Sequence, residues 1–406
     1  METIIISSLL IYFIFIPPTL IKGYRYNVID YGANHRGKSD SSIAFLRAWE
    51  AACNVDSTWV VPPTIYVPRG RYLIKNALVF SGNNCTSMDN DIGMVLRIEG
   101  TLVAPEDYMV LGNMGAWISF EEVSGFTVSG GTIDGKGGRL WACKYGEDSN
   151  CPSGATTLSF TKSKDITISG LRSVNSQLYH IVINECDNVL LQDITVLAPG
   201  SSPNTDGIHV QQSNHVLISN SNIGTGDDCI SVGVGTTDLS IDNVVCGPGH
   251  GISIGSLGKD VDEPGVESVT ATGVIFKGTQ NGVRIKSWGR PSHGYVRNVL
   301  FRNITMDEVQ NPIIIDQNYC PNNLNCPGEE SGVEVSDVTY EEIYGSSATE
   351  VAVKFDCSPK YPCSRIRMKN VQLTYKGQIA TASCANAVGT VDGIIEPIIS
   401  CIIDPN

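Results

Sequence analysis

The centre of the chain carries four short apolar runs: DITI at 165–168, NVLL at 188–191, HVLI at 215–218 and DLSI at 238–241. The runs recur at a nearly regular interval, and similar runs follow more widely spaced near Val269, Val299, Val338 and Ile366. Each run is too short to bury its own apolar face, so the repeating units must stack on one another. A period of about 20–30 residues with several short strands per unit predicts a right-handed parallel β-helix.

Other architectures fit the repeat less well. Propeller blades need periods of roughly 40–50 residues, and βαβ units would need a regular amphipathic helix between the runs, which the sequence lacks. No linker or low-complexity segment divides the chain, so we expect one all-β domain. Its first coil needs a cover, which residues 41–53 can provide as a short helix: apolar residues at 43, 45, 46, 49 and 52 recur with helical spacing, and Asp40 or Ser41 can cap the N-terminus.

The composition is that of a folded, acidic protein. Apolar residues make up 42% of the chain and charged residues 17%, which excludes a disordered chain. The formal net charge is −14 without a basic cluster, which argues against nucleic acid as a partner, because a phosphate backbone needs a basic face. An anionic substrate would have to be held by a few local cations, because the overall field repels it.

The N-terminus carries a long apolar run, TIIISSLLIYFIFIPPTLI at 3–21. We interpret residues 1–23 as a secretory signal peptide that is removed, leaving residues 24–406 as the catalytic domain, although the segment lacks the usual N-terminal Lys or Arg. A membrane anchor is the alternative, but Pro17 and Pro18 would break a helix before it spanned a bilayer. We therefore expect a secreted protein of the extracellular space or cell wall, with no membrane attachment after removal of the signal.

Thirteen cysteines point to an oxidising compartment. Sequence separation favours the disulfide pairs Cys143/Cys151, Cys229/Cys246, Cys320/Cys326, Cys357/Cys363 and Cys384/Cys401, with Cys53/Cys85 as a sixth. Connectivity cannot be read from a sequence, so these remain expectations. Cys186 is left over in an apolar run and is expected to be a buried thiol. Asn84 and Asn303 begin Asn-x-Ser/Thr triplets that could carry glycans.

Three motifs fall at one interval: NTDG at 204–207, GDDC at 226–229 and GHG at 249–251. The step in sequence from Asp206 to Asp228 equals the step from Asp228 to His250. Adjacent coils of a parallel β-helix lie about 4.7–4.9 Å apart, so positions one period apart stack on one face. The spacing therefore gathers these three side chains into one surface site, with Asp227 beside them. The flanking glycines would let the backbone approach a ligand or turn sharply.

The next coil adds two cations to this face. In the run RIK at 284–286, strand alternation puts Arg284 and Lys286 on one side and turns Ile285 toward the core. Each motif alone is common in turns and exposed strands, whereas their coincidence at solenoid spacing predicts a site. Carboxylates facing a groove suit glycoside hydrolysis, in which one protonates the leaving oxygen and another activates water or attacks the sugar. Crowding three of them raises at least one pKa, so we expect an acidic pH optimum.

These motifs, in this order and spacing, resemble the plant polygalacturonases of glycoside hydrolase family 28. Further similarity extends from YNVIDYGA at 26–33 through GTIDG at 131–135 to IDQNYC at 315–320, which is nearly the whole chain after the signal. The resemblance implies hydrolysis of the α-1,4 bonds of pectin and polygalacturonate, with inversion at the anomeric carbon and with no metal or other cofactor.

The resemblance also implies a role for each site residue. Asp227 corresponds to the general acid, and Asp206 and Asp228 correspond to the pair that activates the attacking water. His250 would support the acid. The substrate-binding residues of the family correspond to Asn204, Arg284, Lys286 and Tyr319.

Several alternatives remain open at this stage. Inverting carboxylates usually lie about 6.5–9.5 Å apart, whereas stacking on adjacent coils could bring them closer, so inversion rests on the resemblance. A pectate lyase that binds Ca²⁺ through the three aspartates is one alternative, and a non-catalytic carbohydrate-binding β-helix is another. We favour endo over exo action, although no residue decides between them, and we expect a monomer.

Overall fold

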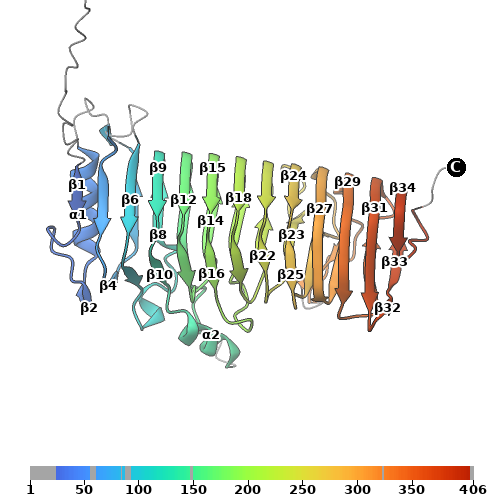
Figure 1. The fold of residues 1–406 in the computed structure, drawn as a ribbon, viewed down its shortest axis with the longest axis horizontal. Helices are drawn as coiled ribbons and strands as arrows, with labels where there is room; N and C mark the ends of the chain where they lie inside the picture. Colours follow the sequence, from blue (N-terminus) through green and yellow to red (C-terminus); the bar gives the residue numbers. More distant parts are fainter. Residues whose placement is uncertain are drawn as a thin grey trace, which may run out of the picture.

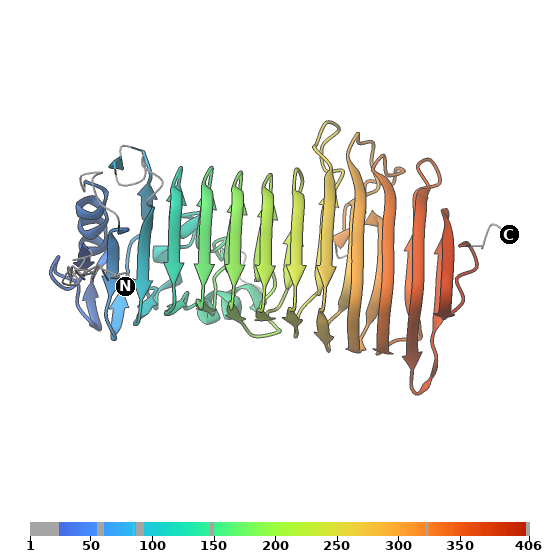
Figure 2. The ribbon, with the colours of Figure 1, turned by 45° about the horizontal axis from the view of Figure 1, so that its top comes forward.

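The computed structural model describes residues 24–54, 61–83, 85–86, 93–146, 150–321 and 324–402. The described chain forms one solenoid whose coils follow one another along its long axis (Figures 1 and 2). The expected signal peptide, residues 1–23, and the possible glycan acceptor Asn84 lie outside these ranges. None of the helices within them has the length and apolar character needed to cross a membrane.

The strands stack in three columns, each made of parallel pairs between successive coils. The first column holds β1 (Arg25–Asn27), β3 (Thr64–Val67), β6 (Met94–Ile98), β9 (Ser124–Ser129), β12 (Lys164–Ser169), β15 (Asp187–Gln192), β18 (Asn214–Ser219), β21 (Thr237–Asp242), β24 (Val266–Thr272), β27 (Tyr295–Val309), β29 (Glu334–Ser347), β31 (Cys363–Tyr375) and β34 (Ala387–Glu396).

The second column is made of shorter strands and merges into β27. It holds β2 (Arg36–Asp40), β4 (Arg71–Leu73), β7 (Thr101–Val103), β10 (Thr132–Asp134), β13 (Arg172–Val174), β16 (Thr195–Leu197), β19 (Asn222–Gly224), β22 (Val245–Cys246) and β25 (Ile275–Lys277).

The third column is a separate 11-stranded parallel sheet. It holds β5 (Leu78–Ser81), β8 (Ala116–Glu121), β11 (Thr156–Thr161), β14 (Ile181–Asn184), β17 (Ile208–Gln211), β20 (Ile230–Val232), β23 (Ile252–Leu257), β26 (Asn281–Trp288), β28 (Asn311–Tyr319), β30 (Val351–Asp356) and β33 (Thr381–Ala385). The described strands pair in parallel except where β31 turns back onto β32 (Gln378–Ile379). The prediction of an all-β, right-handed parallel β-helix is confirmed.

The apolar runs that predicted the fold are the strands β12, β15, β18 and β21 of the first column. The polar residue that opens each run has a left-handed backbone, with φ between 51° and 56° at Asp165, Asn188, His215 and Asp238. Asn and Asp tolerate this conformation better than other non-glycine residues. The repeat in the sequence therefore corresponds to one backbone kink per coil, followed by two alternate apolar residues that face inward. It also extends further toward the N-terminus than the sequence indicates, because β3 and β6 already pair through Ile65 and Leu96.

Alternating side chains of the strands fill a continuous apolar core inside the coils. At the N-terminal end this core is aromatic: Phe80, Phe120 and Phe160 stack with ring centroids 5.0 and 4.8 Å apart. The helix α1 (Ser42–Cys53) covers this end, and its Trp49 lies 4.9 Å from the Phe80 ring (Figure 2). The predicted capping helix is confirmed.

The cap of α1 comes from Asp40, one of the two expected residues: its Oδ1 accepts from the backbone N–H of Ser42 at 2.9 Å, whereas Ser41 occupies the N-cap position without a side-chain capping hydrogen bond. Ile43 is 56% exposed, although its spacing placed it on the apolar face. The buried face is formed by Ala44, Phe45, Ala48, Trp49 and Ala52.

A second helix, α2 (Gly138–Tyr145), was not expected from the sequence. It projects from the side of the solenoid between β10 and β11 (Figure 1). Its C-terminal turn is held by the disulfide between Cys143 and Cys151.

The structure confirms the six expected disulfide pairs. The partners are separated by at most 32 residues in sequence, which is about the length of one coil. Cys186 is free and buried, as expected.

Candidate active site

Three of the expected site residues lie at equivalent positions in successive coils. Asp206, Asp228 and His250 each precede a strand of the third column, namely β17, β20 and β23. The sheet register pairs Ile208 with Ile230 and Ile230 with Ile252, so each of these residues lies one coil beyond the last. The interval seen in the sequence is therefore the coil length at this point of the solenoid.

Glycines beside Asp206 and His250 let neighbouring coils approach closely. A Cβ atom on Gly207 would lie 2.5 Å from the carbonyl oxygen of Cys229 in the next coil. Gly251, which has φ +80°, would place a Cβ atom 2.1 Å from the carbonyl oxygen of Asn281. Both positions exclude any larger residue, because those contacts are far shorter than a van der Waals distance.

Asp228 is buried and is held by two cations. Its Oδ1 lies 2.8 Å from Nη2 of Arg284, and its Oδ2 lies 3.0 Å from Nζ of Lys286. The hydroxyl of Ser253 donates a further hydrogen bond to Oδ1 at 2.7 Å. The two cations come from alternate positions of β26 and flank the buried Ile285. In this structure they neutralise a carboxylate of the site.

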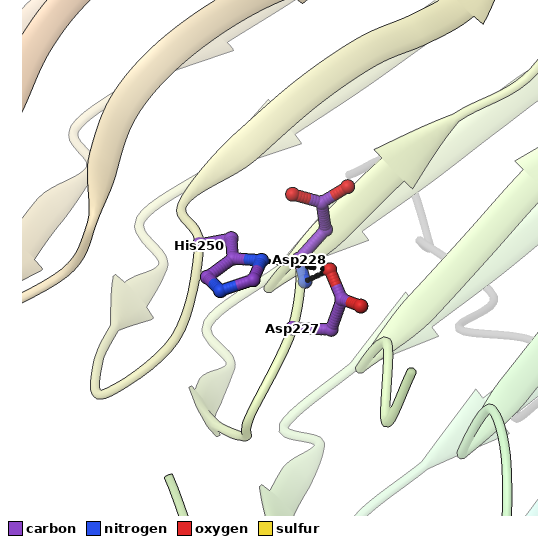
Figure 3. A group of neighbouring side chains, drawn as sticks. All are labelled: Asp227, Asp228 and His250. Carbon is purple, nitrogen blue, oxygen red and sulfur yellow. Dashed lines mark hydrogen bonds and ion pairs between the residues drawn. The ribbon is translucent and has the colours of Figure 1, made fainter. Parts of the chain in front are cut away.

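Asp227 faces His250 (Figure 3). Oδ1 of Asp227 lies 2.9 Å from Nδ1 of His250, and its Oδ2 accepts from the backbone N–H of Asn204 at 3.0 Å. Burial raises the pKa of Asp227, but the hydrogen bond and charge of His250, the charge of Lys286 and a backbone N–H outweigh burial and hold this pKa below its ordinary value. The carboxylate of Asp228 points away from this pair in Figure 3.

Asp206 holds a proton more tightly than Asp227 does. Its side chain is buried, and its Oδ2 is hydrogen-bonded to the Ser231 hydroxyl at 2.6 Å. Burial, followed by repulsion from Asp228 and Asp227, raises the pKa of Asp206 well above its ordinary value. The expectation that crowding raises the pKa of at least one carboxyl group is met here.

Aromatic residues border the cluster on both sides. Tyr319, at the end of β28, lies edge-on to Trp288 at 5.4 Å, and Nζ of Lys286 lies 5.2 Å from its ring centroid. On the other side Tyr179 stacks on His209 with centroids 5.2 Å apart. Burial and the three nearby aspartates raise the pKa of Tyr179 to about 12, so this phenol stays neutral at working pH.

One group of side chains could be considered for a metal ion. Donor atoms of Asp227, Asp228 and His250 lie within 4.8 Å of one another. However, both oxygens of Asp228 already face cations, which disfavours a further positive charge at the same place. Ca²⁺ also prefers six to eight oxygen ligands, and one donor of this group is a nitrogen. The geometry does not match the needs of calcium.

Comparison with known proteins identifies the family of the chain. The model for glycosyl hydrolases family 28 matches residues 58–392. This chain belongs to glycosyl hydrolase family 28. The resemblance drawn from the motifs is thereby confirmed.

Curated relatives of this family 28 chain cover nearly its whole length. A polygalacturonase of Prunus persica is 55% identical over 399 residues, which is 98% of each chain. An exopolygalacturonase of Platanus acerifolia is 40% identical and covers 93% of this chain and 98% of its own.

Solved structures share the fold at lower identity. The polygalacturonase of Erwinia carotovora superposes with a TM-score of 0.67 at 24% identity, covering 95% of this chain and 97% of its own. An exopolygalacturonase of Thermotoga maritima gives a TM-score of 0.68 at 18% identity, covering 90% of this chain and 92% of its own.

The structure also brings residues into this family 28 site that the sequence analysis did not single out. His209, Ser231 and Ser253 form one outward-facing row of the third column and pair directly in the sheet register. The interval that identified the aspartates would also have identified this row, because its members are likewise one coil apart. Tyr179 precedes β14, which pairs with β17. The coil between these two strands differs in length from the coils that follow, so the regular interval could not point to Tyr179.

Proposed function

We propose that this family 28 protein is a polygalacturonase that hydrolyses the α-1,4 bonds of polygalacturonate with inversion. The observation that carries the proposal is the cluster of three aspartates beside two cations on the outer face of one sheet. Carboxylates provide the acid and the base of glycoside hydrolysis, while the cations suit a sugar that bears a carboxylate. The near-complete match to a Prunus persica polygalacturonase supports the same substrate.

Asp227 is the proposed general acid. Its contacts with His250 and Asn204 fix the orientation of the carboxyl group at the edge of the sheet, which a proton donor to the leaving oxygen requires. Asp206 and Asp228 are the proposed pair that activates the attacking water. Asn204, Arg284, Lys286 and Tyr319 are proposed to bind substrate.

The substrate itself is expected to prepare the acid. In the free protein the cluster holds its proton more tightly at Asp206 than at Asp227. A galacturonate carboxylate bound at Arg284 and Lys286 would compete with Asp228 for these cations and add negative charge beside Asp227. Both effects raise the pKa of Asp227 and favour its protonated form in the complex.

The experiment that tests the proposal compares wild type with Asp227→Asn on polygalacturonate. We expect wild type to release reducing ends without forming the ultraviolet-absorbing unsaturated product of a lyase. We expect the variant to lose at least about a hundredfold in kcat, the usual worth of a general acid, with an unchanged circular dichroism spectrum. Unaltered activity in Asp227→Asn would refute the acid assignment.

Two further measurements address the alternatives. Proton NMR of the first-formed reducing sugar should show the inverted anomer, and initial retention would contradict that part of the proposal. Sizing the products over time should show a mixture of short oligomers, as expected for the endo action that we favour over exo. A protein that releases no reducing ends and still binds polygalacturonate would be the non-catalytic alternative.

We also propose that the protein is secreted to the cell wall as a monomer. Six disulfides suit an oxidising compartment, and the side chain of Asn303 on β27 is exposed, as glycan addition requires. N-terminal sequencing of the mature protein should begin near Tyr24. Glycosidase treatment should lower the apparent mass if Asn303 carries a glycan.

A further inference from the structure

Asp206 is joined to a partly buried histidine through a single hydroxyl group. The Oγ atom of Ser231 lies 2.6 Å from Oδ2 of Asp206 and 2.6 Å from Nδ1 of His209. The side chains of Ser231 and His209 are largely shielded from water. Both contacts are short enough to be hydrogen bonds, although a hydroxyl group has only one proton to donate.

Neighbouring side chains determine which nitrogen of His209 carries a proton. Nδ2 of Asn184 donates to the carboxylate of Glu185 at 3.2 Å, which leaves its Oδ1 to accept from Nε2 of Gln211 at 2.8 Å. Oε1 of Gln211 then faces Nε2 of His209 at 3.1 Å. A carboxylate only accepts hydrogen bonds, so these contacts fix the orientation of the Asn184 and Gln211 amides. Nε2 of His209 must therefore carry a proton that it donates to Oε1 of Gln211.

Counting donors and acceptors leaves two arrangements of protons for the hydrogen bonds between Asp206, Ser231 and His209. If Ser231 donates to Nδ1 of His209, then Asp206 must be protonated and donate to Ser231. If Ser231 donates to Asp206 instead, Nδ1 must carry a proton, and His209 is an imidazolium. Either arrangement contains one proton in addition to that of the hydroxyl group and to the proton on Nε2.

We propose that Asp206, Ser231 and His209 form a proton relay that holds one transferable proton, either on the carboxyl group of Asp206 or on Nδ1 of His209. For transfer, the Asp206 O–H bond breaks as its proton joins Ser231 Oγ, and the hydroxyl proton of Ser231 passes to Nδ1. The total charge is unchanged, since a neutral pair becomes a carboxylate and an imidazolium. No electrons or other reactants are involved.

The charges around the relay favour the proton on Asp206 in the free protein. Asp228 and Asp227 repel negative charge on Asp206, and Lys286 opposes them in part. Burial lowers the pKa of His209, which outweighs the raising effects of Gln211 and Asp228, and Lys286 lowers it further. Arg284 is paired with Asp228, and Tyr179, which stacks on the imidazole, is neutral. The raised pKa of Asp206 and the lowered pKa of His209 both agree with a neutral Asp206 beside a neutral His209.

The relay deepens the proposed hydrolysis and rests on it for its catalytic meaning. In the free protein the relay holds the one proton of the cluster, and a protonated Asp206 cannot accept a proton from water. Passage of that proton to Asp227 in the substrate complex leaves Asp206 as the carboxylate that can accept one. His209 thus acts through Asp206 and is a positioning residue for the base. Because Asp206 and His209 can both hold the proton, the cluster retains it to a higher pH than an isolated carboxyl group would.

The first test is the pH profile of kcat/KM for His209→Phe in two backgrounds. Phenylalanine keeps the ring against Tyr179 and removes both nitrogens, so Ser231 can donate only to Asp206 and thereby favours its carboxylate. The alkaline limb, which marks loss of the one proton of the cluster, should move to lower pH by about one unit. In a Ser231→Ala background, which lacks the connecting hydroxyl group, adding His209→Phe should not move the alkaline limb further.

The control is His293→Phe, which changes an exposed histidine paired with Asp262 and should leave the limb at its wild-type position. An equal shift from His209→Phe in both backgrounds, or no shift in either, would overturn the relay. A purely structural role of His209 would lower activity without moving the limb.

A second test does not depend on activity. In the full-length wild-type protein labelled with ¹⁵N-histidine, we expect His209 to remain neutral, with its proton on Nε2, while the exposed His215 titrates. A neutral His209 with its proton on Nδ1 would overturn the relay. A protein that released no reducing ends from polygalacturonate would refute the proposed function and leave this NMR result to be judged separately.

Discussion

At the scale of single residues, the three aspartates are distinguished by their partners. Asp228 faces two cations, Asp227 faces a histidine, and Asp206 faces a buried hydroxyl group on the outer side of the sheet. Asp206 and Asp227, although chemically identical, therefore have different affinities for a proton. Such separation of environments allows one site to supply both an acid and a base.

The raised pKa of Asp206 makes a prediction about stability. A buried carboxyl group with a raised pKa stabilises the fold below its unfolded-state pKa, and this contribution is lost as the pH rises through the folded-state pKa. Asp206→Asn replaces the ionisable group with a neutral one that can still donate to Ser231. We expect the melting temperature of the variant at pH 7 to exceed that of wild type by on the order of 1–2 °C, with a smaller difference at pH 4. Equal differences at both pH values would contradict the ionisation of Asp206 as the cause.

Sequence spacing could predict which residues gather in the site but not how they pair. Asp206, Asp228 and His250 follow from the regular coil length. The pairing of both cations with Asp228 depends on side-chain length and burial across 56 and 58 residues of sequence, which no local pattern encodes. The same is true of the link between Asp206 and His209: the coil interval places Ser231 next to His209, but it does not reveal the hydrogen bonds of the Ser231 hydroxyl group.

At the scale of elements, α1 and the coils depend on each other. The helix buries one face against the aromatic stack of the first coils, and without it those rings would be exposed at the end of the solenoid. The sequence predicted this helix because its apolar spacing is regular. It did not predict α2, whose eight residues are too few to show a clear period.

The contact between α1 and the core leads to a prediction for Trp49. Trp49→Ala should lower the free energy of unfolding by about 3–5 kcal/mol, because a large buried side chain is removed and a cavity remains. The matched control is Ile43→Ala on the same helix, where the side chain is 56% exposed and the loss should stay below about 0.5 kcal/mol. Urea denaturation followed by far-ultraviolet circular dichroism measures both. Equal losses for the two variants would show that α1 does not seal the end of the core.

At the scale of the whole molecule, a net charge of −14 surrounds a site that contains two largely buried cations. The proposed polyanionic substrate must therefore be attracted locally against an unfavourable overall field. Low pH reduces this repulsion by protonating surface carboxylates, and it also supplies the proton that the cluster needs.

The pH dependence of activity combines these effects. We expect kcat/KM on polygalacturonate to be greatest at acidic pH and to fall as the pH rises past the point where the cluster loses its one proton, because no acid then remains. Initial rates at constant ionic strength between about pH 3 and pH 8 measure this profile, with circular dichroism confirming that the fold persists throughout. A rate that stayed constant from about pH 4 to pH 8 would contradict the prediction.

The short disulfides have a mechanical consequence for the intact molecule. The partners of each bridge are at most 32 residues apart, so none of these covalent links clasps distant coils together. Along the solenoid, coils are held to their neighbours chiefly by hydrogen bonds and apolar contacts. A molecule stretched between its two ends in an optical trap should therefore lengthen in steps that each correspond to one coil. The loops closed by disulfides should add no length until a reductant is present.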